Sequence, residues 1–232
     1  MTLEAVILTY AKKPLEQLEA VRKTWAKDVD YVMLGDPSQQ GGDIISYPEV
    51  PENNYDYLWI KYLAFIKRNE FAKDWYFFCD DDTFVNVKNL KTVLEKYDPT
   101  QNVCIGSKCI LNKDGTDRFG TPTGFLMETI KGKDVSLPLT HPSGGSGFAL
   151  SKKTLQLLKD YLKGNKDIGY CYKVDAALAF WLTKINTELI HVDEFYGNVP
   201  EHFNHTEEDI KKNITYHYIK QEQMYDLYKL CC

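Results

Sequence analysis

The sequence predicts an α/β protein with a mostly parallel sheet that helices cover on both faces. In the first half of the chain, apolar runs of strand length alternate with segments whose apolar residues recur at helical spacing. Strands and helices that alternate in this way form parallel sheets. The clearest strand is the apolar run 75–79, whose lack of polar alternation is typical of a strand buried on both faces. We therefore expect this run to be a central strand.

The elements expected before this strand form a regular series. In chain order they are a strand at 5–10, a helix from Pro14 to Trp25, strands at 31–34 and 44–47, and a helix whose apolar stripe runs from Leu58 to Ile66. Proline is well suited to the first turn of the first helix, because its fixed φ matches the helix and its missing N–H has no partner there.

The second half of the chain is less regular. The expected elements are a short helix at 87–94, a strand at 103–110, loops or short antiparallel strands at 112–142, a helix from about Ser151, a buried helix at 174–182, a strand at 188–192 and a strand or ordered arm at 214–218. Gly106 lies inside one of these strands and predicts a bulge or a close backbone approach.

Composition and charge limit the class of protein. With 232 residues and 44% hydrophobic content, the chain is long enough to bury a full core as one domain. Its net charge is -5 and its lysines are dispersed, which argues against nucleic acid as the main partner. No apolar run approaches the ~20 residues of a membrane span. We therefore expect a soluble chain without a membrane span.

Three consecutive carboxylates, Asp80, Asp81 and Asp82, follow the central strand directly. Ligands of open α/β sheets bind outside the carboxyl ends of the strands. Adjacent carboxylates repel one another, and a divalent cation that shares their oxygens relieves this repulsion. Asp80 and Asp82 are therefore a candidate metal pair. The alternative is that these acids cap a helix that begins near Val85.

Other polar or flexible positions allow two interpretations each. The glycine-rich segment 144–147 is either a tight structural turn or a place where the backbone approaches a ligand. Asp175, near the start of an apolar helix, either complements the helix dipole or acts as a general base. His217, between aromatic residues, is either structural or a ligand. Trp59 and Trp181 are candidate stacking surfaces or core residues.

Several motifs occur in an order that resembles a known family. They are Thr9, Thr24 with Trp25, Leu58 and Trp59 with Lys61, the Asp-Trp-x-x-x-x-Asp-Asp-Asp-Thr segment at 74–83, the glycine-rich segment at 144–151, Pro200 with Glu201 and His202, and Tyr216, His217 and Tyr218 followed by Met224 and Tyr225. In this order they resemble the catalytic domain of the fringe and core 1 β1,3-galactosyltransferase group, glycosyltransferase family 31. The resemblance covers nearly the whole chain and implies the GT-A fold.

The resemblance also implies an activity. Enzymes of this group are metal-dependent and inverting, and they move a hexose from a UDP-sugar to a hydroxyl of a glycan or glycoconjugate acceptor. By resemblance, Asp80, Asp82 and His217 would bind Mn2+ or Mg2+, and Asp175 would be the catalytic base. The residues implied in binding the nucleotide sugar are Thr9, Lys61, Asp80, Asp81, Gly144 and Gly145. The linkage expected from this group is β1,3. At one position the chain departs from the family, because Val174 replaces its usual Glu.

These implications extend to the organisation of the chain. We expect one catalytic domain over residues 1–232, with a nucleotide-binding half at 1–110 and an acceptor-binding half with a C-terminal arm at 111–232. The compartment would be the cytoplasm if Met1 is the native start, and the Golgi or ER lumen if this is an excised catalytic domain. The oligomeric state is left open.

Two alternative functions fit parts of the same pattern. One is a noncatalytic module of the same fold that binds a nucleotide sugar or a glycan. The other is a different metal-dependent enzyme, of the nucleotidyl or phosphoryl class, which would need a second cluster of acids.

Overall fold

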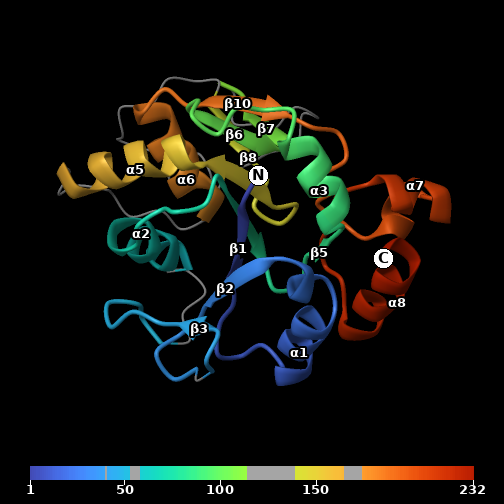
Figure 1. Ribbon diagram of the computed structural model, residues 1–232. Helices are drawn as coiled ribbons and strands as arrows, with labels where there is room; N and C mark the ends of the chain where they lie inside the picture. Colours follow the sequence, from blue (N-terminus) through green and yellow to red (C-terminus); the bar gives the residue numbers. More distant parts are fainter. Residues whose placement is uncertain (40, 53–57, 114–138, 165–173) are drawn as a thin grey trace.

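A seven-stranded sheet forms the centre of the protein (Figure 1). The computed structural model describes residues 1–39, 41–52, 58–113, 139–164 and 174–232, and the side chains of residues 111 and 174–176 are outside this description. The strands of this sheet, in their spatial order, are β10 (Glu188–His191), β6 (Val103–Gly106), β9 (Phe148–Ser151), β4 (Trp75–Asp80), β1 (Leu3–Leu8), β2 (Asp30–Leu34) and β3 (Ile44–Ile45).

The sheet is mostly parallel, as the sequence predicts. Strand β4 lies in the middle of the order and pairs in parallel with β1, which pairs in parallel with β2. Strands β10 and β6 are also parallel to each other. The exception is β9, which lies between β4 and β6 and is antiparallel to both.

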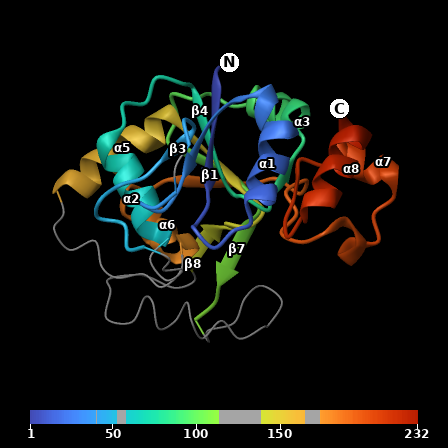
Figure 2. The ribbon, with the colours of Figure 1, turned by 90° about the horizontal axis from the view of Figure 1, so that it is seen from below.

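Helices cover both faces of the sheet, and Figures 1 and 2 show the two groups on opposite sides. One face carries α1 (Leu15–Lys23), α3 (Val87–Leu94) and α8 (Gln221–Cys231), and the other carries α2 (Leu58–Arg68), α5 (Lys152–Gly164) and α6 (Val174–Lys184). Among the helices described, none combines the length and the apolar character that a membrane crossing requires.

The alternation of side chains along β4 explains why there are two hydrophobic cores. Successive side chains of a strand point to opposite faces of its sheet. Trp75 and Phe77 therefore pack in the core beneath α1, α3 and α8, while Tyr76 and Phe78 pack in the core beneath α2, α5 and α6. All four side chains are at most 2% exposed. The prediction of a central strand buried on both faces is confirmed.

Strand β9 was not predicted. The sequence predicts a turn at 144–147 followed by a helix from about Ser151, but residues Phe148–Ser151 form a strand and the helix begins at Lys152. The reason is that this short apolar run pairs with distant strands on both sides, a tertiary effect that local periodicity does not contain.

The single strand expected at 103–110 is two strands. Strand β6 ends at Gly106, and β7 (Lys108–Leu111) leaves the large sheet to pair antiparallel with β8 (Leu139–Pro142). The expectation of a close approach at Gly106 is confirmed, since a β-carbon there would lie 3.0 Å from Cβ of Phe148. Most of the expected loop region 112–142 lies outside the described residues.

The C-terminal segment returns to the centre of the protein. It contains a 3-10 helix (Pro200–Phe203), α7 (Glu207–Lys212) and β11 (Thr215–Tyr216), and β11 pairs antiparallel with β5 (Phe84–Val85). Helix α3 is capped by Asn86, whose side chain accepts a hydrogen bond from the backbone N–H of Asn89. The alternative that the three consecutive aspartates cap this helix is therefore wrong.

The tight turn before β9 leads to a first prediction. Gly147 has a φ of +75°, and a β-carbon at this position would lie 2.3 Å from Cζ of Phe77. We expect Gly147→Ala to lower the free energy of unfolding by about 3 kcal/mol, because it combines left-handed strain with overpacking. Urea unfolding measures this change. Gly42→Ala is the matched control, since its β-carbon would meet no atom within 4 Å, and an equal loss in both variants would contradict the prediction.

Candidate metal centre

The three aspartates lie at the carboxyl edge of the sheet. Strands β1 and β4 are in register with Leu8 opposite Asp80, so the chain leaves both strands at the same edge. The backbone N–H of Asp81 continues this pairing, because it donates to the carbonyl of Leu8 at 3.1 Å. Thr9, which follows β1, is 2% exposed and lies at this edge as well.

A histidine from the C-terminal segment joins two of the aspartates. One ligand atom from each of Asp80, Asp82 and His217 lies within 4.8 Å of the others. Nε2 of His217 is 3.1 Å from Oδ1 of Asp82 and 3.5 Å from Oδ2 of Asp80. Carboxylate oxygens suit Mg2+ and Mn2+, and imidazole is a common ligand for divalent metals. The donor set therefore fits a divalent cation.

Backbone hydrogen bonds hold the C-terminal segment in place at this cluster. The N–H of Ile219 donates to the carbonyl of Asp82 at 2.9 Å, and the N–H of His217 donates to the carbonyl of Asn198 at 3.3 Å. The side-chain amide of Gln17, on α1, donates to the carbonyls of both Asp81 and Ile219 at 3.1 Å. The cluster is thus assembled from β4, the segment after β11, and α1.

The glycine-rich segment packs directly against the histidine. A β-carbon on Gly145 would lie 2.3 Å from Nδ1 of His217, so only glycine allows the imidazole to occupy its position. The hydroxyl of Thr83 donates to the carbonyl of Gly145 at 3.0 Å. The turn itself is closed by a hydrogen bond from the N–H of Gly147 to the carbonyl of Gly144 at 2.9 Å. The segment is therefore a tight turn that also forms one wall of the cluster.

Lys13 pairs with two of the carboxylates, a contact that the sequence does not predict. Its Nζ lies 2.9 Å from Oδ1 of Asp81 and 2.9 Å from Oδ2 of Asp82. Asp81 is only 1% exposed, and this burial raises the pKa of its carboxyl to about 6, against the opposing effect of Lys13. Partial burial alone would lower the pKa of Lys13. The nearby carboxylates of Asp81 and Asp82 have the larger combined effect and raise the pKa of Lys13 above the ordinary value of a lysine. A lysine after a predicted strand carries no local signal of this pairing.

The charges of the cluster shift the pKa values of its members in opposite directions. Burial raises the pKa of Asp82, but His217 and Lys13 outweigh burial and lower it to about 2. Burial lowers the pKa of His217, but hydrogen bonds and charge from Asp80 and Asp82 outweigh burial and raise it to about 9. Without a metal ion, His217 is therefore a cation at neutral pH.

Lys61 fixes the position of the loop that follows β1. It is 1% exposed, and its Nζ lies 2.6 Å from Oδ1 of Asp36. The same ammonium donates to the carbonyl of Thr9, and Asp36 also accepts a hydrogen bond from the N–H of Ala11 at 2.9 Å. Burial lowers the pKa of Lys61, although Asp36 opposes this shift. The pair ties the backbone of residues 9–11 to α2.

Three other candidate residues, Asp175, Trp59 and Trp181, lie on the helices of the opposite face of the sheet. Asp175 is the second residue of α6, but its side chain lies outside the described part of the chain. Trp59 and Trp181 are 8% and 1% exposed and make an edge-to-face contact with ring centroids 6.4 Å apart. Of the two interpretations of these tryptophans, the structure supports core packing.

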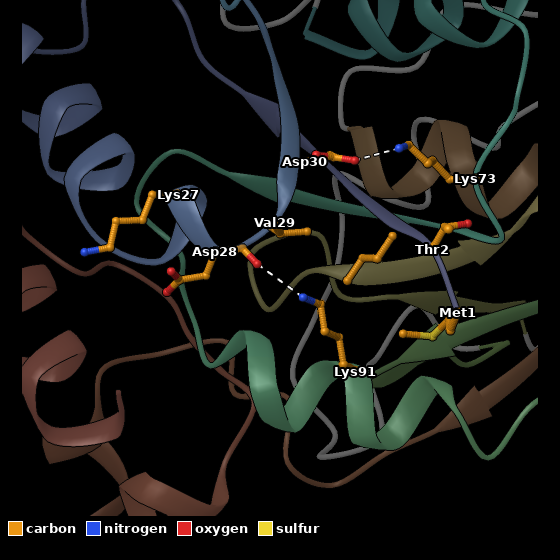
Figure 3. A pocket seen from close by; sticks show the side chains of 9 residues that line it. Met1, Thr2, Lys27, Asp28, Val29, Asp30, Lys73 and Lys91 are labelled. Carbon is orange, nitrogen blue, oxygen red and sulfur yellow. Dashed lines mark hydrogen bonds and ion pairs between the residues drawn. The ribbon is translucent and has the colours of Figure 1, made fainter.

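A cavity of about 410 Å³ lies elsewhere in the protein (Figure 3). It is lined by residues at the amino ends of β1 and β2, at the opposite edge of the sheet from the aspartates. Two of the lysines that line it have partners within the protein. Nζ of Lys73 lies 2.6 Å from Oδ2 of Asp30, and Nζ of Lys91 donates to the carbonyl of Asp28 at 3.2 Å. This cavity is not part of the candidate metal centre.

Several solved structures with a similar fold are glycosyltransferases. The galactosyltransferase LgtC, in a complex with donor and acceptor sugar analogues, is 12% identical over 97% of this chain and 95% of its own, with a TM-score of 0.50. An active-site variant of LgtC gives 12% identity, 97% and 94% coverage, and a TM-score of 0.53. A glycosyltransferase involved in glycosylation of the major capsid of PBCV-1 gives 14% identity, 98% coverage of both chains, and a TM-score of 0.51. The protein has the GT-A glycosyltransferase fold.

The family follows from the sequence itself. Residues 52–230, well over half of the chain, match the family model described as Fringe-like. The chain therefore belongs to the Fringe-like family, and it is a glycosyltransferase. The matched region contains all three residues of the candidate metal cluster.

The raised pKa of His217 predicts how the stability of the metal-free protein depends on pH. Because the folded-state pKa is about 9 against an ordinary 6.5, the histidine stabilises the folded state fully below pH 6.5, and the effect is lost as the pH rises through 9. The contribution is at most roughly 3 kcal/mol. In the presence of a chelator, urea unfolding of wild type and His217→Gln should differ most near pH 6 and converge near about pH 10. A difference that does not change with pH would contradict this.

A further prediction concerns the buried Lys61–Asp36 pair. We expect Asp36→Asn to lower the free energy of unfolding by about 3–5 kcal/mol, because it leaves a buried ammonium without its counter-ion. The double variant Asp36→Asn/Lys61→Met should recover a large part of this loss, since it removes the charge as well. Chemical denaturation of both variants is the measurement. If the double variant is as unstable as the single one, packing rather than charge explains the loss.

Proposed function

We propose that this protein is a metal-dependent, inverting glycosyltransferase that moves a hexose from a UDP-sugar to a hydroxyl of a glycan or glycoconjugate acceptor. The observation that carries this proposal is the Asp80–Asp82–His217 cluster at the carboxyl edge of the sheet. Ligands of open α/β folds bind at this edge. The resemblance to the fringe and β1,3-galactosyltransferase group supports a UDP-sugar donor and a β1,3 linkage.

Asp80, Asp82 and His217 would hold the divalent ion, with Mn2+ or Mg2+ as the candidates. When bound, such an ion stabilises negative charge on the leaving diphosphate as a Lewis acid. Lys13 adds a fixed positive charge at the same place, since its ammonium lies 2.9 Å from Asp82 and its side chain is 22% exposed. A diphosphate that approaches this edge would therefore meet a cationic side chain.

The segments around the cluster would bind the rest of the donor. Thr9 lies at the carboxyl end of β1, and Lys61 fixes its backbone through the carbonyl. Asp81 would act through Lys13, which it holds beside Asp82. Gly144 and Gly145 would let the backbone approach the sugar. In this proposal, residues 1–110 form the nucleotide-binding half, and 111–232 supply the acceptor site and the C-terminal arm.

Asp175 would be the general base. A carboxylate that takes the proton from the acceptor hydroxyl makes the oxygen a better nucleophile. Attack from the face opposite the leaving diphosphate inverts the anomeric centre. Asp175 lies in the first turn of an apolar helix. Because Val174 replaces the family's Glu, Asp175 is the acidic residue at this position of the chain and hence the candidate base.

The test is release of UDP from a panel of UDP-sugars, with and without Mn2+. We expect metal-dependent release from one donor by the wild type. Asp82→Asn should lose metal-dependent UDP binding, because it removes a ligand charge from the cluster. Asp175→Asn should bind UDP normally but turn over about 10²- to 10⁴-fold more slowly, which is the ordinary size of general-base catalysis.

Asp226→Asn is the matched control, since its carboxylate is 78% exposed and lies on α8 away from the cluster. It should behave as the wild type in both assays. Metal-dependent UDP binding without turnover of any donor, with acceptor glycans present, would instead favour a noncatalytic binding module. If UDP does not bind with metal present, the proposal is wrong.

A further inference from the structure

Tyr218 has a backbone conformation that is unusual for its residue type. Within the described residues, three positions other than glycine have a positive φ: Asn186 at 52°, Asn204 at 54° and Tyr218 at 60°. Asparagine adopts this left-handed region readily, whereas a bulky aromatic residue is a conformational outlier there. Outliers of this kind persist only where the surrounding structure enforces them, and they cluster at functional sites.

The neighbours of Tyr218 enforce this turn. His217 and Ile219 are 8% and 1% exposed, whereas Tyr218 between them is 59% exposed. The N–H of Ile219 donates to the carbonyl of Asp82, and its own carbonyl accepts from Gln17. The backbone must therefore turn outward for one residue and return. Glycine or asparagine would make this turn with less strain, so the turn alone does not explain a tyrosine.

The contact of the tyrosine ring offers an explanation. The ring of Tyr218 lies against the imidazole of His217, with centroids 3.8 Å apart and planes inclined by 32°. The backbone at Gly145 also approaches the imidazole so closely that no β-carbon fits between them. These two contacts restrict rotation of the imidazole and keep its Nε2 directed at Asp80 and Asp82.

We propose that Tyr218 is a positioning residue, whose ring holds His217 in the orientation that completes the metal cluster. This inference rests on the metal site of the proposed function and adds a residue that does not itself contact the ion. The strained backbone at Tyr218 is then a consequence of placing its aromatic ring against the imidazole of His217. Groups that orient a metal ligand typically change metal affinity by about 10- to 100-fold when they are removed.

Calorimetric titration of the full chain with Mn2+ alone tests this role. We expect Tyr218→Asn to bind Mn2+ roughly tenfold more weakly than wild type, because asparagine fits the left-handed turn but has no ring. Its melting temperature should be no lower than that of wild type, since the strain is relieved. Tyr218→Phe keeps the ring and should bind Mn2+ as the wild type does. A residue with a merely structural role would instead change stability and not metal affinity.

Asn186→Gly is the matched control, since it changes another residue with a left-handed backbone. Asn186 lies between α6 and β10, the outermost strand of the sheet, away from the Asp80–Asp82–His217 cluster. It should leave Mn2+ affinity unchanged. Equal Mn2+ affinity in wild type and Tyr218→Asn would overturn the positioning role alone, as would an equal loss in Tyr218→Phe. If the wild type shows no saturable Mn2+ binding, the metal site of the proposed function fails as well, so the two failures are distinguishable.

Discussion

The negative charge of three consecutive aspartates is the constraint on which the site depends. Asp80, Asp81 and Asp82 stand together at the end of a buried strand, and like charges this close repel one another. Two cations from distant parts of the chain compensate this charge. Lys13 pairs with Asp81 and Asp82, and His217 pairs with Asp80 and Asp82. This charge compensation holds both the loop after β1, which carries Lys13, and the C-terminal segment, which carries His217, at the carboxyl edge of the sheet.

The single antiparallel strand of the large sheet explains how the glycine-rich turn reaches the same edge. Strand β9 runs opposite to β4, with Phe148 opposite Phe78, so its beginning lies near the end of β4. The residues just before β9 therefore arrive beside the aspartates. This arrangement lets Gly145 pack against His217 and lets Thr83 donate to the Gly145 carbonyl. A parallel strand would place the turn at the opposite edge.

Burial separates the groups that support the site from those that are accessible at its surface. Lys61, Asp36 and Asp81 are each 1% exposed, and their charges are paired inside the protein. Asp80 and Asp82 have side chains that are 36% and 21% exposed and remain accessible at the edge. A buried ion pair adds little net stability but is costly to break. The buried pairs therefore fix loop positions, while the exposed carboxylates remain available for binding.

The sequence by itself determined the α/β class and the order of most elements, and it singled out Asp80 and Asp82 as a candidate metal pair, because each depends on local periodicity or on adjacent residues. It did not reveal β9, whose four residues are a strand only because β4 and β6 flank them. Motif resemblance could nominate His217, but only tertiary structure placed its Nε2 within 3.1 Å of Asp82 and brought Lys13 to the same carboxylate. These contacts join residues far apart in the chain, and electrostatic pairing at such separations leaves no periodic trace in the sequence.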